Sequence, residues 1–218
     1  MMAFTFSGYL SILGIFVLVK YTFPKFSIYI DAFFFFATVI VMATSNANTQ
    51  KQVCGFSDSG VVITTMAPWT MLAIMMIVLR IYPVWRKPFA NTVGHLVLTF
   101  ANGGGKLRSV LEHGANWVKQ TRLKTMMDES PYALLYEMGY KPMPEFQTTL
   151  DKLAQDESIG EFTFPANDTS VDELISVLYL RDLFGEMTWF LLVGMVAMTV
   201  SYNVIVSCNG QAKLNATA

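Results

Sequence analysis

The stretch VVITTMAPWTMLAIMMIVLRIYPVWRKPFANTVGH, residues 61–95, decides the fold class of this chain. Its first 19 residues, 61–79, carry no charge. A helix of that length spans about 30 Å, which is the thickness of the hydrocarbon core of a bilayer. Trp85, Arg86 and Lys87 follow, as expected where a helix leaves the membrane on its basic side. The stretch therefore predicts a membrane-spanning helix with a defined exit.

The composition of the whole chain also indicates a membrane protein. The 218 residues are 53% hydrophobic and only 14% charged, whereas soluble domains carry about 25% charged residues. This length accommodates a few spans and one modest polar domain. Two cysteines are too few for a disulfide-dense scaffold or for a four-cysteine zinc or iron–sulfur site.

Hydrophobic segments divide the chain into four predicted spans. The first segment has neither basic residues before it nor a small-residue cleavage site after it, so we expect a retained span and not a signal peptide. The predicted fold is an all-α membrane protein with four transmembrane helices and a helical polar domain between the third and the fourth. We expect transmembrane helices at residues 1–20, 26–44, 61–85 and 187–207, a polar loop at 45–60, a partly amphipathic polar domain at 86–186 and a polar tail at 208–218.

One carboxylate, Asp31, falls inside the second predicted span. It lies only about two turns from the boundary, where it can reach the lipid headgroups or Lys25. Charge at mid-bilayer costs about 3 kcal/mol on insertion scales. We therefore expect interfacial pairing of this carboxylate, with a functional intramembrane carboxylate as the alternative.

The polar domain is predicted to begin with a helix on the bilayer surface. Phe89, Val93, Leu96 and Phe100 recur at i, i+4, i+7 and i+11, which places them on one helical face. Such a face directly after a span is typical of a helix in the membrane interface, and a soluble core helix is the alternative. The glycine-rich segment 102–106 predicts a flexible turn, because its spacing does not fit a phosphate-binding loop.

Further helices are expected in the rest of the polar domain. Residues 107–127 form a basic amphipathic helix in this interpretation. A short helix is bracketed by Ser130-Pro131 and Gly139, which are preferred cap residues. A capping box at 170–173 introduces a helix at 174–184 that can continue into the last span. Another helix is marked by Phe146, Leu150 and Leu153.

The distribution of basic residues predicts the topology. Of the 15 Lys and Arg residues, 13 lie in the first turn, at the end of the third span or in the polar domain. With four spans these regions share one side, so the positive-inside rule puts residues 86–186 on the cytosolic side.

Charge is also divided within the polar domain. Residues 86–127 hold 7 basic and 1 acidic side chain, whereas residues 128–186 hold 3 basic and 13 acidic ones. We expect the basic part to face anionic headgroups, and the acidic part to meet a basic protein surface or simply solvent. The membrane-facing basic residues are Arg86, Lys87, Lys106, Arg108, Lys119, Arg122 and Lys124.

Both cysteines fall on the opposite side of the membrane in this topology, each just beyond a span. A bridge between Cys54 and Cys208 would close a loop of more than 150 residues, which is worth up to about 5 kcal/mol in the chain-entropy model. Two unrelated buried thiols fit the sequence equally well.

Catalytic and metal-binding signals are sparse. His95 and His113 are the only histidines and have no cysteine or second histidine at ligand spacing. No serine-hydrolase or metalloprotease motif occurs. The sequence therefore predicts a protein that is not an enzyme, with no cofactor, no metal site, no nucleic-acid partner and no small-molecule substrate.

Two patches of the sequence resemble a membrane protein family of the large nucleocytoplasmic DNA viruses, found in algal viruses and mimivirus relatives. The first patch combines Pro68-Trp69 with an exit motif of Tyr82, Pro83, Trp85, Pro88, Phe89, Asn91, Thr92 and Gly94, in which Ala90 stands where the family tends to have serine. The second patch comprises Trp189, Gly194, Val200, Ser201, Tyr202, Asn203 and Ile205, followed by Cys208.

The resemblance implies a structural protein of the virion. Such a protein sits in the internal membrane of an icosahedral particle, derived from host membrane during assembly, and links it to the capsid shell as a minor capsid protein in many copies. Its partners would be the lipid bilayer and capsid or other minor capsid proteins. Residues 83–94 would fix the exit from the bilayer, and Trp189, Gly194 and 201–203 would pack among the spans. The alternative function is a small four-span channel or transporter subunit, which needs polar residues along a shared path.

Overall fold

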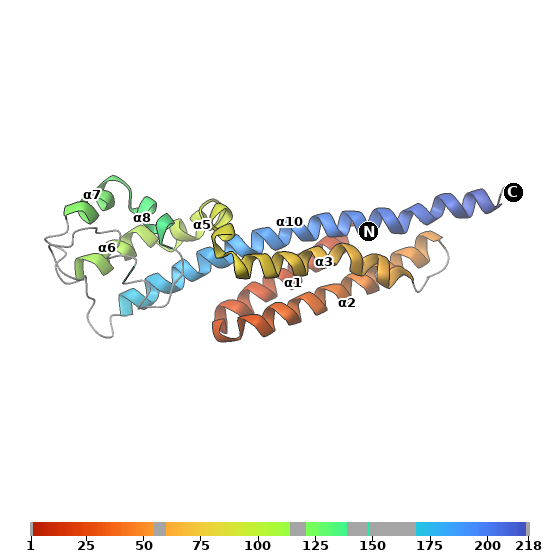
Figure 1. Cartoon of the computed structure of the whole chain (residues 1–218), viewed down its shortest axis with the longest axis horizontal. Coiled ribbons are helices and arrows are strands. Elements are labelled where there is room, and N and C mark those ends of the chain that lie inside the picture. The colour runs from red at the N-terminus through yellow and green to blue at the C-terminus, as the bar shows by residue number, and fades with distance from the viewer. Residues whose placement is uncertain (1, 55–59, 114–120, 139–147, 149–168, 217–218) are drawn as a thin grey trace. The chain divides into compact units, whose positions relative to one another are not determined.

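A computed structural model describes residues 2–54, 60–113, 121–138, 148 and 169–216 of the chain (Figure 1). Within these ranges, the side chains of 2–5, 53–54, 113, 121–123, 126, 137 and 206–216 are not described. Every regular element of the described residues is a helix. The predicted all-α class is therefore confirmed.

The chain divides into two compact units, which we call unit 1 and unit 2. Unit 1 comprises residues 1–84 and 187–218, and unit 2 comprises residues 85–186. A single unbroken helix, α10 (Thr169–Ala216), contributes its first part to unit 2 and the remainder to unit 1. The expectation that the helix after the capping box continues into the last span is confirmed.

Unit 1 is a bundle of long helices lying side by side (Figure 1). Helix α1 (Met2–Thr22) is joined by the short 3-10 helix η1 (Pro24–Phe26) to α2 (Ser27–Cys54), and α3 (Gly60–Ile81) and the second part of α10 complete the bundle.

Three of the described helical segments are long and apolar enough to cross a membrane. They are Pro24–Gln52, Gly60–Ile81 and Thr169–Ile205, while the apolar part of α1, Phe6–Thr22, is shorter. These segments are compatible with a multi-pass membrane protein. The count of four spans remains a prediction.

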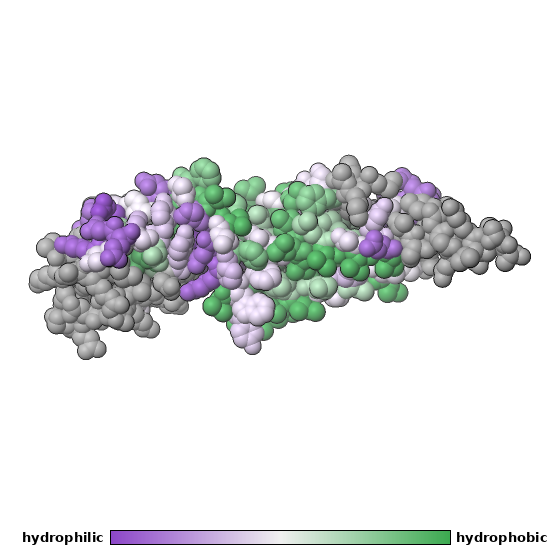
Figure 2. All heavy atoms as spheres, turned by 90° about the horizontal axis from the view of Figure 1, so that it is seen from above, coloured by the Kyte–Doolittle hydropathy of each residue, from purple (hydrophilic) through white to green (hydrophobic). Residues whose placement is uncertain are grey.

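The outer surface of the bundle is apolar. Phe33, Ile63 and Leu18 are each more than two-thirds exposed, and Figure 2 shows hydrophobic side chains over much of this part of the chain. Exposed apolar patches of this extent are uncommon on soluble monomers. A hydrocarbon solvent covers them without cost, so the surface matches the predicted membrane environment.

Aromatic packing fills the interior of the bundle. The rings of Phe16 and Phe34 lie 4.4 Å apart between their centroids, and Phe190 of α10 lies 5.6 Å and 5.9 Å from them. Offset and tilted ring pairs at such distances add about 0.5–1.5 kcal/mol beyond the area they bury. This aromatic cluster joins α1, α2 and α10.

Unit 2 is a small helical domain built around the first part of α10. Its other described helices are η2 (Pro83–Arg86, which begins in unit 1), α4 (Lys87–Ala90), α5 (Val93–Phe100), α6 (Gly103–His113), α7 (Thr121–Glu129) and α8 (Pro131–Glu137). Its aliphatic core contains Leu98, Leu107, Val110, Leu111, Met127, Leu134, Leu135, Met138, Val171, Leu174, Val177 and Leu178.

Three boundaries in unit 1 differ from the predicted ones. Helix α2 continues to Cys54 through most of the predicted polar loop, because Asn46 is buried and its amide donates to Thr65 Oγ1 of α3 at 2.9 Å. Helix α3 ends at Ile81 and not at 85, since Pro83 opens a 3-10 turn. Helix α10 extends to Ala216, into the predicted polar tail.

The glycine-rich segment of unit 2 also differs from its prediction. Gly103 to Gly105 form the first turn of α6, and the chain turns at Asn102, whose φ of 51° is left-handed. Asparagine is one of the few residues other than glycine that adopts this conformation readily. The helix predicted at 107–127 overlaps α6 and α7, and residues 114–120 between them lie outside the described residues.

The helix predicted after Ser130 is confirmed. Its hydroxyl oxygen accepts a hydrogen bond from the Ala133 amide at 3.3 Å at the start of α8. The helix marked by Phe146, Leu150 and Leu153 lies outside the described residues.

Candidate functional site: helix packing and the membrane-exit segment

A nearly buried ion pair lies between α1 and α2. The Lys20 ammonium is 2.6 Å from Asp31 Oδ1, and the two side chains are 5% and 15% exposed. Arg80 of α3 lies 3.9 Å from the other carboxylate oxygen. Asp31 is therefore paired as expected, but with Lys20 and not with Lys25.

Tyr9 forms the joint between α1, α3 and α10. It is fully buried, its hydroxyl donates to the Phe190 carbonyl at 2.6 Å, and its ring meets Trp69 edge-on at 5.4 Å. A Cβ atom on Gly194 would lie 2.3–2.4 Å from the Tyr9 ring and hydroxyl. Only glycine at 194 leaves room for the ring, so Trp69 and Gly194, which come from the two resemblance patches, meet at Tyr9.

The other residues proposed for helix packing lie at different depths. Ser201 is buried, and its hydroxyl has no hydrogen-bond partner among the described residues. Trp189 and Tyr202 are half-buried, whereas Asn203 is exposed. The side chains of Cys54 and Cys208 are not among those described, so their bridge stays a prediction.

The exit motif supplies a close helix contact within unit 2. A Cβ atom on Gly94 would lie 2.7 Å from Arg181 Cγ and 2.8 Å from its carbonyl oxygen, and one on Gly185 would lie 2.8 Å from the Ala90 amide nitrogen. Small residues at 90 and 94 on one side, and at 185 on the other, let the backbones approach, as in small-xxx-small helix pairs. Ala90 is thus a buried packing residue.

The remaining residues of the exit motif lie around this contact. Thr92 Oγ1 donates to the Pro88 carbonyl at 2.8 Å. The Asn91 side-chain oxygen is buried without a hydrogen-bond partner in the described part of the chain. Phe89 is half-buried, and Pro83 and Trp85 are exposed.

The predicted surface helix is interrupted by a turn at 91–92, so that Phe89 lies in α4 and Val93–Phe100 form α5. Leu98 and Gly94 are buried, whereas Leu96 is 57% and Phe100 87% exposed. A helix buried in the core of a soluble domain would not expose a leucine and a phenylalanine on one face. The interfacial position of α5 remains a prediction.

Among the described residues of unit 2, Arg181 is the most buried charged group, with only 1% of its side chain exposed. Its guanidinium donates to the carbonyl oxygens of Leu135 and of Met138, the latter at 2.8 Å, and to Asp182 Oδ1 at 2.6 Å. The last carbonyls of a helix have no partner within it. Arg181 therefore satisfies the carboxyl end of α8 and fixes that helix to α10.

The predicted basic membrane face is partly neutralised. The Lys106 ammonium pairs with Glu173 of α10, and Arg108 pairs with Asp128 at 3.0 Å and with Glu112 at 3.7 Å. The basic and acidic parts of the domain are therefore joined by ion pairs. Arg86, Lys87 and Lys124 are half-buried, while Lys119 lies outside the described residues and the Arg122 side chain is not described.

His95 belongs to an aromatic cluster. Its Nδ1 and the Tyr136 hydroxyl share a hydrogen bond of 2.7 Å, and its ring meets Tyr132 edge-on at 5.0 Å. No group of three or more His, Cys, Asp or Glu side chains in metal-ligating arrangement occurs among the described residues.

Tyr9, Lys20 and Arg181 were not identified from the sequence. For Arg181 a signal exists, because it continues the i, i+4, i+7 spacing of the buried Leu174 and Leu178. A guanidinium at such a core position indicates a buried polar anchor. Tyr9 gives no comparable signal, since its role depends on a glycine 185 residues away.

Comparison with known proteins finds no matching family model, no matching curated protein and no matching solved structure.

Proposed function

We propose that this chain is a structural membrane protein that joins a lipid bilayer to a protein layer beside it. Following the resemblance, the bilayer is the internal membrane of an icosahedral large DNA virus, and the protein layer is its capsid shell. The chain would then be a minor capsid protein present in many copies, with residues 86–186 on the cytosolic side during assembly.

The observation that carries this proposal is the continuity of α10. The same helix supplies Phe190 and Ala197 to the interior of unit 1, and Leu174 and Leu178 to the core of unit 2. The described residues of α10 thus contribute to both cores with no separate linker between them. This is what a protein joining two layers needs.

The local architecture of unit 2 supports a domain held at the membrane. The exposed Leu96 and Phe100 of α5 suit insertion among headgroups, and Trp85 is an aromatic residue of the kind that concentrates at interfaces. The capsid side of the proposal rests on the resemblance and on the excess of acidic residues in 128–186.

Fractionation of purified virus particles tests the proposal. Particles are extracted with a mild detergent, and the shell and lipid fractions are probed for this chain. Retention on the delipidated shell is the expected result, and crosslinking from 128–186 then identifies the partner. Release with the lipid would contradict a capsid link, and absence from particles would overturn the viral assignment.

A small channel or transporter subunit is the second candidate, favoured by polar side chains inside unit 1. Thr38, Asn46, Thr49, Gln50, Thr65 and Ser201 are all buried. Ion flux through liposomes that contain the purified chain, lost on substitution of Asn46 by leucine, would establish this alternative. Absence of flux would leave the structural role.

A further inference from the structure

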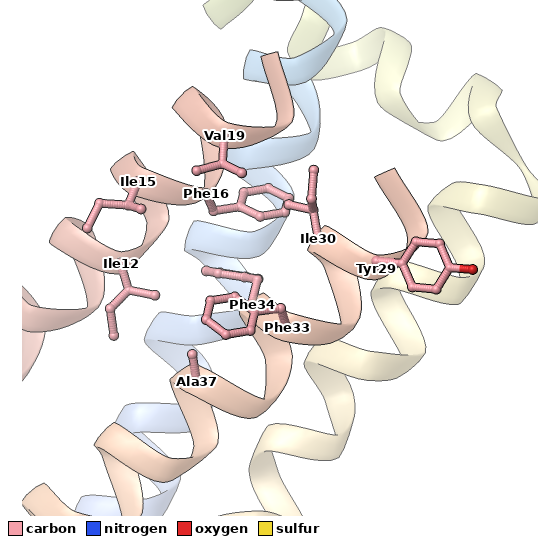
Figure 3. Close-up of a pocket in the computed structure, with 9 residues that line it drawn as sticks. All are labelled: Ile12, Ile15, Phe16, Val19, Tyr29, Ile30, Phe33, Phe34 and Ala37. Atoms are coloured by element: carbon pink, nitrogen blue, oxygen red, sulfur yellow. The ribbon is translucent and has the colours of Figure 1, made fainter. Parts of the chain in front are cut away.

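A groove with a volume of about 300 Å³ lies between α1 and α2 (Figure 3). Its lining is entirely aliphatic and aromatic. The lining residues are Ile12, Ile15, Phe16 and Val19 of α1, and Tyr29, Ile30, Phe33, Phe34 and Ala37 of α2. Ile15, Tyr29 and Phe33 are each more than half exposed, so the groove is open to the surroundings of the bundle.

The groove covers about two-thirds of the thickness of one leaflet. From Ile12 to Val19 the lining spans eight residues of α1, or about 10 Å along the helix. One leaflet contributes half of the hydrocarbon core of about 30 Å. The volume also lies at the lower end of the range for pockets that hold small ligands, about 300–1,000 Å³.

Charged residues adjoin the lining of the groove in the sequence. Lys20 and Asp31 directly follow Val19 and Ile30 of the lining, and their ion pair neutralises both charges. Arg80 lies at the edge of this pair with half of its side chain exposed, and Lys25 is exposed in η1 between the two helices. Three cations and one carboxylate leave a net charge of +2 at the end of the groove lined by Val19 and Ile30.

Aromatic side chains also lie close to the charged end of the groove. Tyr21 and Tyr29 are exposed close to the charged end, and Figure 3 shows the Tyr29 hydroxyl directed away from the rest of the lining. Tyrosine is enriched where the hydrocarbon core meets the headgroups. The charged end of the groove therefore lies where the phosphate of a lipid would be.

We propose that the α1–α2 groove binds one anionic phospholipid, with an acyl chain along Ile12–Val19 and the headgroup phosphate at Arg80 and Lys25. A zwitterionic lipid offers the same chain but no net charge to this end, so the site selects by headgroup. Binding would tie α1 to α2 and would not depend on the capsid link proposed above.

The test uses the full-length chain in nanodiscs of phosphatidylcholine mixed with phosphatidylglycerol at a ratio of 4:1. After release of the protein, native mass spectrometry counts the retained lipids. We expect one phosphatidylglycerol to be retained in preference to phosphatidylcholine. Lys25→Gln and Arg80→Gln should each lower its retention about fivefold, because each removes roughly 1 kcal/mol of headgroup attraction.

Lys51→Gln is the matched control, since Lys51 is an exposed lysine at the other end of α2. It should leave retention unchanged. Ala37→Phe fills the groove and should release both lipids, with thermal unfolding showing that the variant remains folded. Equal retention of the two lipids, or insensitivity to Lys25 and Arg80, would overturn the proposal. A dimer that excludes lipid would instead assign the groove to a second copy of the chain.

Discussion

Unit 1 and unit 2 each bury a cationic side chain, and they satisfy it in different ways. In unit 1, Lys20 is paired with the Asp31 carboxylate. In unit 2, Arg181 is shared between the Asp182 carboxylate and the backbone carbonyls at the end of α8. A point charge between apolar helices is best met by an opposite charge, whereas the planar guanidinium can bridge several acceptors at once. Unit 1 thus joins two helices by an ion pair, whereas unit 2 joins α8 to α10 by a guanidinium that also satisfies the carboxyl end of α8.

The two units share a second device, which is a glycine at the tightest contact. Gly194 accommodates the Tyr9 ring in unit 1, and Gly94 accommodates the Arg181 backbone in unit 2. In both cases α10 is one of the partners. The contacts of α10 therefore affect the packing of both units, and substitutions can test the contribution to each unit separately.

Loss of one member of the Lys20–Asp31 pair should have the largest effect on stability. Lys20→Met should lower the free energy of unfolding of unit 1 by about 3 kcal/mol, because it removes the nearest cation, 2.6 Å away, from a largely buried carboxylate and leaves Arg80 at 3.9 Å. Denaturation in mixed micelles followed by circular dichroism measures the change. The double variant Lys20→Met/Asp31→Leu should recover most of it. No recovery would mean that the lysine contributes through packing and not through charge.

Arg181→Met should destabilise unit 2 by about 2–3 kcal/mol, since it leaves two buried carbonyl oxygens without a donor. Hydrogen exchange should accelerate in α8, with the amides of unit 1 unchanged. Arg108→Met is the control, because that side chain is exposed and makes only surface ion pairs. Equal effects of the two variants would contradict the capping role of Arg181.

A matched pair of glycines tests the Tyr9 joint. Gly194→Ala should cost about 1–3 kcal/mol through overpacking against the ring, whereas Gly14→Ala, where a Cβ atom meets nothing within 4 Å, should be neutral or stabilising by about 0.5–1 kcal/mol. Thermal unfolding in detergent compares them. If the two substitutions behave alike, the close approach of Tyr9 does not determine the packing of α10.

Removal of the Lys106–Glu173 pair should have the smallest effect on stability. Both side chains are partly exposed, and surface ion pairs contribute about 0–1 kcal/mol. Glu173→Gln should therefore change the stability of unit 2 by less than 1 kcal/mol, and less still at high salt. Denaturant unfolding at two ionic strengths measures it. A larger loss would show that this pair holds α6 against α10.

The helical class, the membrane-type spans and the continuity of α10 could be predicted because they depend on local composition and periodicity. Details that depend on distant residues could not. Asn46 and Gln50 look like loop residues, yet they are buried in α2 once α3 packs beside it. The glycines at 103–105 look like a break, yet the left-handed residue is the preceding Asn102. Gly194 and Gly94 were singled out by resemblance, but their steric reasons appear only with Tyr9 and Arg181 in place.

The position of α10 in the chain affects biosynthesis. It is the last of the described elements to leave the ribosome, and synthesis proceeds from the amino terminus. Until α10 emerges, the core of unit 2 lacks Val171 to Leu178, and the Tyr9 ring lacks its contact with Gly194. Neither unit can reach its final packing during translation of the first 168 residues. Maturation of both units therefore waits for the synthesis of α10, and a nascent chain stalled before α10 would be a natural target for membrane quality control.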